Sequence, residues 1–280
     1  MTTRSTLRRS AAALIVGAAL LLGACGGSNS DSSSGATGAS STTAAPKALK
    51  VVVTNDDGYD SPGIDAIVQA LRAESGVEVT VVAPATQQSG KGGAVTGGAL
   101  SASDLLTKSG YPVKAVAGTP ADSIIWAVEQ KGLPFTPDFV VSGINAGANL
   151  GPVVDLSGTI GAARAAVQRG IPAIAASNGA LAGPFAPTEA AKVVIDWFRK
   201  NRDAIASGTI DKTQVFNLNI PTCATGAIRG EVTVPISTTD NSFLANQPDC
   251  SSSATDPKND VSAYMIGFAP LSILPARPAS

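Results

Sequence analysis

Residues 51–58 read VVVTNDDG, an apolar run that ends in two adjacent carboxylates and a glycine. The run has the composition of a buried strand, because β-branched side chains pack well on a pleated surface. Similar strand patterns recur at 49–55, 77–84, 137–143, 171–178 and 215–221, and helical patterns lie between them at 64–74, 120–131, 157–170 and 187–201. Alternating strands and helices predict an α/β fold with a doubly wound, mainly parallel sheet.

Three segments do not follow this alternation. Residues 99–118 predict a less regular hairpin, and the polar stretch 222–262 predicts a long loop or excursion. Residues 262–274 predict a final strand or hairpin. The predicted fold is therefore a three-layer αβα sandwich with a hairpin, a loop excursion and a short C-terminal strand region.

The N-terminal part predicts export. Three arginines precede an apolar run that ends in LGAC (22–25), which resembles the lipobox of bacterial lipoproteins. The run is short for a spanning helix, which needs about 20 apolar residues, so an ordinary secretory signal or a membrane anchor is the weaker alternative. We predict a signal peptide over 1–24, a lipidated Cys25 on a flexible Ser/Gly/Thr tether (25–47), and a globular domain over 48–280. The protein is then exported and lipid-anchored to the outer face of the bacterial cell membrane.

Composition excludes several kinds of chemistry. The 280 residues include no histidine, which rules out Ser-His-Asp triads and His-ligated zinc. A net charge of −1 gives no basic stripe for binding a nucleic-acid duplex. Carboxylates, hydroxyls, amides and a hard metal ion remain available for catalysis.

Two cysteines, Cys223 and Cys250, follow the predicted export signal. An oxidising compartment favours a disulfide between them, which we expect to lie away from the strand ends; two free thiols remain the alternative.

Polar residues follow several predicted strands, and in such sheets ligands bind beyond the carboxyl ends of the strands. Adjacent carboxylates repel each other unless a cation neutralises them. A divalent cation takes oxygen ligands, and the strand ends supply a set of four: Asp56, Asp57, Ser89 and Asn145. Asp-Gly alone is also common in tight turns. Asp122 lies in the first turn of a predicted helix behind Thr119 and Pro120, where we expect a structural role.

Several motifs, in order, closely resemble the SurE survival proteins, a family of metal-dependent nucleotidases. They are TNDDGYDSPGI (54–64), VVAPATQQSG (81–90), GTPADS (118–123), PDFVVSGINAGANLG (137–151), SGTIGAAR (157–164) and GIPAIAAS (170–177). The resemblance covers about 48–178, and NLNIP (217–221) and GFAPLSIL (267–274) are similar to the family's later strands. It implies a Rossmann-like core, Mg²⁺ or Mn²⁺ on the four oxygen ligands, and hydrolysis of nucleoside 5′- or 3′-monophosphates.

The resemblance also implies a phosphate site at Gly90, Asn149, Ser157, Gly158 and Thr159. A helix that starts at Ser-Gly-Thr can bind an anion by itself, and a plain N-cap is the weaker alternative for Ser157. In the implied mechanism Asp56 or Asp57 accepts a proton from a metal-activated water, and a phospho-aspartate intermediate is the alternative. Segment 222–280 resembles the family weakly, which leaves a homodimer open. A solute-binding lipoprotein is the rival function, but it usually has two similar lobes.

Overall fold

The computed structural model describes residues 47–180 and 183–278. They belong to one compact unit, Ala45–Ser280. The predicted signal peptide, Cys25 and the tether up to residue 46 lie outside the described residues. Within the described part, no helix is long and apolar enough to span a membrane.

The described residues form one nine-stranded sheet in the order β3-β4-β2-β1-β5-β6-β7-β9-β8. Its strands are β1 (Leu49–Thr54), β2 (Val77–Pro84), β3 (Ala102–Leu106), β4 (Pro112–Val116), β5 (Phe139–Ala146), β6 (Ala173–Asn178), β7 (Gln214–Ile220), β8 (Glu231–Thr233) and β9 (Ala269–Pro275). From β4 to β7 all neighbours are parallel, whereas β3 and β9 run antiparallel to β4 and β7. The predicted α/β fold with a mainly parallel sheet is confirmed.

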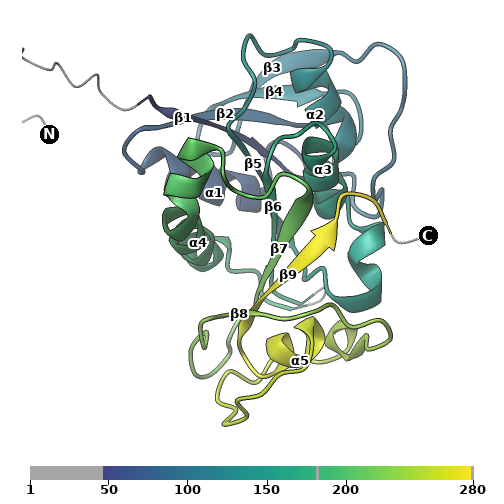
Figure 1. Ribbon diagram of the computed structural model, residues 1–280. Helices are drawn as coiled ribbons and strands as arrows, with labels where there is room; N and C mark the ends of the chain where they lie inside the picture. Colours follow the sequence, from purple (N-terminus) through teal and green to yellow (C-terminus); the bar gives the residue numbers. More distant parts are fainter. Residues whose placement is uncertain (1–46, 181–182, 279–280) are drawn as a thin grey trace, which may run out of the picture. The chain divides into compact units, whose positions relative to one another are not determined.

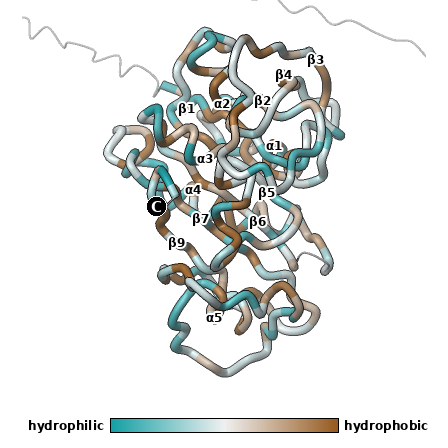
Figure 2. Tube along the Cα trace, turned by 90° about the vertical axis from the view of Figure 1, so that its right-hand side faces the viewer, coloured by the Kyte–Doolittle hydropathy of each residue, from teal (hydrophilic) through white to brown (hydrophobic). Residues whose placement is uncertain are grey.

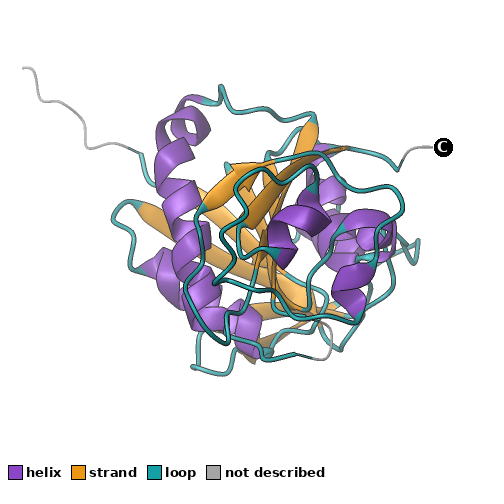
Figure 3. Cartoon of the chain, turned by 90° about the horizontal axis from the view of Figure 1, so that it is seen from below, coloured by secondary structure: helices purple, strands orange, loops and turns teal. Residues whose placement is uncertain are grey.

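Helices cover both faces of the sheet (Figures 1 and 3). They are α1 (Pro62–Arg72), α2 (Pro120–Val128), α3 (Gly158–Val167), α4 (Pro187–Ser207) and the short α5 (Asp260–Met265), with 3₁₀ turns at Gly151–Leu156 and Ser242–Leu244. Helices α1 and α4 pack on one face, and α2 and α3 pack on the other. The result is the predicted three-layer sandwich.

Strand β1 shows how the sequence builds both cores. Val51 and Val53 face α1 and α4, while Val52 between them faces α2 and α3. Successive side chains of a strand point to opposite faces, so a strand covered on both sides must be apolar throughout. Figure 2 shows the apolar residues gathered in the central strands.

The start of α2 follows the capping pattern that the sequence predicted. The Thr119 side chain accepts a hydrogen bond from the backbone N–H of Asp122, and Asp122 accepts one from the N–H of Thr119. Thr96 lies in a Gly-rich loop, QQSGKGGAVTGG (87–98), and also donates to Asp122 through its backbone N–H (3.1 Å) and its hydroxyl. Asp122 therefore has a structural role: it caps the helix and anchors one end of that loop.

The structure corrects three predicted boundaries. Strand β5 continues past Gly143 to Ala146, and α4 continues past residue 201 to Ser207. Helix α5 (260–265) replaces the end of the predicted loop excursion and the first residues of the strand or hairpin predicted for 262–274. The Asn259 side chain starts this helix by accepting a hydrogen bond from the N–H of Ser262, which the strand prediction overlooked.

The polar excursion contains a small core of its own. Phe243 and Tyr264 are fully buried and pack with Leu150, which lies beyond the end of β5. The Asp260 carboxylate accepts a hydrogen bond from the N–H of Gly151 at 2.7 Å. The excursion therefore packs on the loop that carries Asn149.

A disulfide joins Cys223 to Cys250, with their Cα atoms 5.6 Å apart. The predicted location was wrong for Cys223, because β7 ends at Ile220 and runs parallel to β6. Cys223 therefore follows the carboxyl edge of the sheet by three residues.

Candidate active site

The candidate site lies at the topological switch point of the sheet, where the chain leaves β1 for one side and later returns to pair on its other side. Strand β1 lies between β2, which follows it in the chain, and β5, which the chain reaches later on the other side. Such a switch point opens a crevice outside the carboxyl ends of its strands. Asp56 and Asp57 follow β1, and Asn145 lies near the end of β5.

On the face toward α2 and α3, the strands change from apolar to polar side chains near this edge. The changes are Val52 to Thr54, Val140 to Ser142, Ala175 to Ser177 and Val215 to Asn217. These positions alternate with residues of the opposite face, so the change occurs within single rows of side chains.

Asp56 is only 2% exposed and points at the start of α3. The Thr159 hydroxyl donates a hydrogen bond to its Oδ1 at 2.7 Å. A Cβ atom on Gly158 would lie 2.7 Å from the Asp56 Cβ, so only glycine permits this approach. Burial raises the pKa of Asp56, and the Thr159 hydroxyl is the main influence in the opposite direction.

Asp57 is the more accessible of the two carboxylates. Its Oδ2 accepts a hydrogen bond from the backbone N–H of Ala146 at 3.0 Å, which ties it to the end of β5. Burial, followed by the charge of Asp56, raises the pKa of Asp57 to about 6. Within the described residues, no lysine or arginine nitrogen lies within 4.0 Å of either carboxylate.

A β-bulge in β5 determines the position of Asn145. Ser142 pairs with Ala175 and Asn145 pairs with Ser177, so β5 takes three steps where β6 takes two. Gly143 has φ +130°, and a Cβ there would lie 2.2 Å from the Ala176 carbonyl oxygen. The Asn145 Nδ2 donates to the Gly147 carbonyl at 2.6 Å, which leaves the amide oxygen as the end for a cation.

A backbone hydrogen bond of the neighbouring residue, Gln88, determines where the loop that carries Ser89 lies. The Gln88 N–H donates to the Asp56 carbonyl oxygen at 2.6 Å, which places the loop beside β1. Ser89 itself is exposed, and its hydroxyl accepts a hydrogen bond from the Gln87 side chain. Neither Ser89 nor the exposed Gly90 forms a hydrogen bond with the carboxylates of Asp56 and Asp57 in this structure. By contrast, Asp56 is bonded directly to Thr159 and Asp57 to Ala146.

The predicted phosphate residues divide into two groups. Ser157 caps α3 by accepting a hydrogen bond from the Ile160 N–H at 3.2 Å, as in the plain N-cap alternative. Gly158 and Thr159 contact Asp56 directly, so the Thr159 hydroxyl is directed at a carboxylate and not at an open anion site. The phosphate role of these residues stays a prediction. Asn149 is held by β6 and β7.

The sequence analysis assigned no role to two asparagines of β7 that contact Asn149. Asn217 and Asn219 are fully buried, and both donate to the Asn149 carbonyl oxygen. The pattern Asn-Leu-Asn could have revealed them. Polar residues two apart share one face of a strand, and a buried parallel strand is otherwise apolar.

The donor set fits a hard cation. Among the described residues, no cluster of three or more His, Cys, Asp and Glu side chains could hold a metal. Two carboxylates completed by neutral oxygens remain, which suits a divalent ion that binds oxygen. A buried Asp56 beside a half-buried Asp57, with no basic partner, is unfavourable without such a positive charge.

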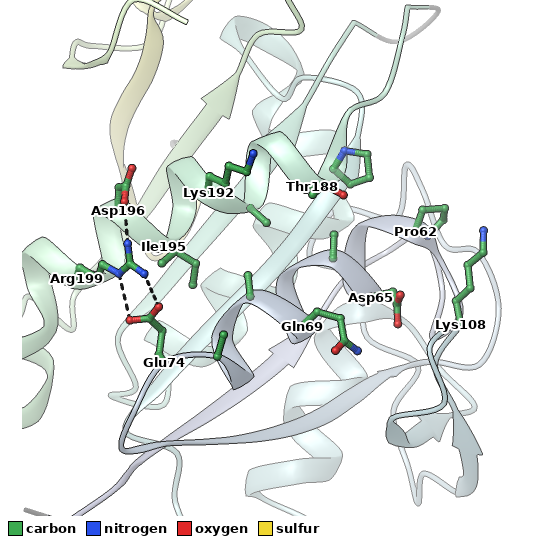
Figure 4. A pocket seen from close by; sticks show the side chains of 15 residues that line it. Pro62, Asp65, Gln69, Glu74, Lys108, Thr188, Lys192, Ile195, Asp196 and Arg199 are labelled. Atoms are coloured by element: carbon green, nitrogen blue, oxygen red, sulfur yellow. Dashed lines mark hydrogen bonds and ion pairs between the residues drawn. The ribbon is translucent and has the colours of Figure 1, made fainter.

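A groove of about 670 Å³ lies elsewhere, between α1 and α4 (Figure 4). Arg199 crosses one end of it with a two-pronged ion pair to Glu74, at 2.7 and 3.1 Å. Asp65, Gln69 and Lys192 also line the groove, but none of the predicted site residues does. The volume of a groove is therefore no guide to the site here.

Comparison with known proteins identifies the family. The model of the family described as "Survival protein SurE" matches residues 51–242. The chain belongs to the SurE family. The match begins in β1 and includes every residue of the candidate site described above.

Relatives in the SurE family are similar over most of this range. A protein named 5′-nucleotidase SurE from Pelobacter propionicus is 41% identical over 182 residues, which cover 65% of this chain and 69% of the relative. One of the same name from Carboxydothermus hydrogenoformans is 40% identical over 185 residues, covering 65% and 68%. The crystal structure of the SurE protein from Aquifex aeolicus has a TM-score of 0.64 at 27% identity, and the match covers 82% of this chain and 95% of that one.

Proposed function

We propose that this SurE-family protein hydrolyses nucleoside 5′- or 3′-monophosphates to nucleoside and phosphate with a divalent cation, Mg²⁺ or Mn²⁺. The observation that carries the proposal is the adjacent pair at the switch point, a buried Asp56 and a half-buried Asp57, with no basic partner within 4.0 Å among the described residues. The named activity of the relatives, 5′-nucleotidase, supports the same reaction class.

Four residues would hold the cation: Asp56, Asp57, Ser89 and Asn145. When bound, the cation offsets phosphate charge and lowers the pKa of a coordinated water. For Ser89 this requires the hydroxyl to turn from Gln87 toward the carboxylates, a change confined to an exposed loop residue.

The two carboxylates have different tasks. Asp56 is buried and fixed by Thr159, so it serves as a rigid anchor. Asp57 is more accessible, and only its Oδ2 is engaged, by the Ala146 N–H. Asp57 is therefore the carboxylate that we assign to accept a proton from the attacking water. We propose that Asn149 and the N-terminal end of α3 bind the phosphate, as the resemblance to the family implies.

The rival function, a solute-binding lipoprotein, lacks structural support. Such proteins usually have two similar lobes, whereas the described residues form one unit around one sheet. We retain export and lipid anchoring as a separate proposal, which rests on LGAC (22–25) and the tether behind it. A homodimer is likewise a proposal, supported only by the resemblance to the family.

Release of inorganic phosphate from 5′-AMP tests the function. Wild-type protein with Mn²⁺ should release phosphate, and excess EDTA should abolish the release. Asp56→Asn should lower turnover by at least about 10–100-fold, because loss of outer-shell metal partners alone costs that much. Asp203→Asn, an exposed aspartate of α4, is the matched control and should retain activity. Near wild-type turnover of Asp56→Asn in excess Mn²⁺ would reject the assignment.

A further inference from the structure

Asn219 of β7 binds the backbone of Asn149 like a second peptide group. Its Oδ1 accepts a hydrogen bond from the Asn149 N–H at 2.7 Å, and its Nδ2 donates to the Asn149 carbonyl at 3.1 Å. The Asn219 amide thus pairs with both the N–H and the carbonyl of the Asn149 backbone. Asn219 is 1% exposed, so water does not compete for these bonds.

Two further contacts complete the support of Asn149. Asn217 donates to the same carbonyl oxygen at 3.0 Å, and the Asn149 side chain donates to the Ser177 hydroxyl at 2.9 Å. The backbone is therefore fixed from β7 and the side chain from β6. Neither strand is adjacent in sequence to the loop after β5 that carries Asn149.

The arrangement of Asn217 is costly for stability alone. Its Oδ1 is buried and has no hydrogen-bond partner among the described residues. A buried acceptor left unpaired is unfavourable, and an apolar side chain of similar size would avoid this cost. Val215, two residues earlier on the same face, is such an apolar side chain. The amide at position 217 is accounted for by its bond to Asn149.

The strand register connects the residues that hold Asn149 with Asn145, one of the predicted metal ligands. Asn145 pairs with Ser177, and Ser177 pairs with Asn219, so the three residues form one row across β5, β6 and β7. Asn149 is bonded to two members of this row. The row therefore sets the distance between Asn149 and Asn145, the ligand predicted for the cation.

We propose that Asn219, assisted by Asn217, is a positioning residue that holds Asn149 in place to bind the substrate phosphate. This inference rests on the proposed function and deepens it. It extends the active site to β7, beyond the residues that contact substrate or metal. A loop held in place before substrate arrives needs no ordering at binding, so its loss should weaken phosphate binding.

Substitution of Asn219 separates phosphate binding from metal binding. Asn219→Leu should raise the KM for 5′-AMP and the Ki of inorganic phosphate about 10-fold or more. The Kd of Mn²⁺ measured by calorimetry should stay within about 3-fold, because Asp56 and Asp57 are unchanged. Val215→Ala is the matched control: it opens a cavity in the same strand and lowers the melting temperature but should leave KM and Ki unchanged.

A second variant covers the case in which Asn219→Leu does not fold. Asn217→Leu removes one of the three bonds to the Asn149 backbone together with the unpaired oxygen. It should melt no lower than wild type while it raises the KM and the phosphate Ki, by less than Asn219→Leu does. An unchanged KM and Ki in a folded Asn217→Leu or Asn219→Leu protein would overturn the proposal.

A double-mutant cycle shows whether Asn219 acts through Asn149. In an Asn149→Ala background, Asn219→Leu should raise the KM by less than about 2-fold, because the positioned side chain is already absent. The proposal would be overturned if the double variant raised the KM by the product of the two single-variant effects. Failure of the proposed function has a different signature, since wild-type protein would then release no phosphate from 5′-AMP. Binding of inorganic phosphate by calorimetry, with Mn²⁺ present, would still compare the variants in that case.

Discussion

The hydroxyl of Thr159 donates a hydrogen bond to Oδ1 of Asp56 across 2.7 Å, and both side chains are buried. A threonine hydroxyl carries one proton. While it is bonded to Asp56, it cannot donate to a phosphate. The bond fixes the orientation of the Asp56 carboxylate at the start of α3.

Replacement of Thr159 by valine should weaken metal binding. Thr159→Val keeps the shape of the side chain but removes the donor, so Asp56 loses its orientation. We expect the Kd of Mn²⁺ to rise about 10–100-fold, as for other outer-shell partners. Thr159→Ser keeps the hydroxyl and should restore most of the affinity. Calorimetric titration with Mn²⁺ measures both variants, and an unchanged Kd for Thr159→Val would contradict the interpretation.

Replacement of Gly158 should disturb Asp56 from the other side. In Gly158→Ala the new Cβ would lie 2.7 Å from the Asp56 Cβ and 2.9 Å from its Oδ2, so α3 or β1 has to shift. We expect a loss of about 1–3 kcal/mol in unfolding free energy and a large fall in turnover. Gly93→Ala is the control, because its Cβ would meet no atom within 4 Å. Equal melting temperatures for the two variants would show that the contact is not tight.

Asp122 should make stability depend on pH on the acid side. Burial acts to raise the pKa of Asp122, but hydrogen bonds from Thr96 and Thr119 outweigh it and lower the pKa below its usual value. A depressed pKa in the folded state stabilises the fold above the unfolded pKa of about 3.9 and stops doing so as pH falls through the folded pKa. Asp122→Asn should therefore lower the free energy of unfolding at pH 7, measured by urea denaturation, by about 1 kcal/mol. The difference from wild type should shrink below about pH 4; a constant difference at all pH values would argue against a charged Asp122.

The disulfide should stabilise the excursion. Cys223 and Cys250 are 27 residues apart, and closing such a loop is worth about 3–4 kcal/mol on the chain-entropy model. The double variant Cys223→Ser/Cys250→Ser should lose up to that much unfolding free energy in urea. Thiol counting on denatured, non-reduced protein that lacks residues 1–25 should find no reactive thiol, and two after reduction. Two thiols before reduction would refute the bridge in solution.

Cys25 should determine where the protein resides. Wild-type protein should fractionate with membranes and resist a salt wash, because two or more acyl chains hold firmly where one does not. Cys25→Ser should be released into the soluble fraction. Cys223→Ser, which removes a thiol from the globular domain, should stay with the membrane. Full-length wild-type protein with an intact Met1 in the cytoplasm would refute export.

The sequence by itself determined the layers of the fold and the edge of the sheet at which the site lies. The runs at β1, β5 and β6 are mainly apolar before the carboxyl edge because they are covered on both faces, and that pattern needs no tertiary information. Capping by Thr119 and Asp122 is a local effect and was predicted for the same reason. Asp56 and Asp57 were recognisable because adjacent charges at the end of a buried strand are unfavourable without a partner.

Only the tertiary structure decided what the polar side chains bind. Thr159 lies 103 residues from Asp56, and Asn219 lies 70 residues from Asn149. The period of a strand says which face a side chain occupies but not which loop covers it. The burial of Tyr264 likewise depends on how the polar excursion packs on Leu150. Contacts between distant segments form only when the whole sheet is assembled, so no local pattern in the chain encodes them.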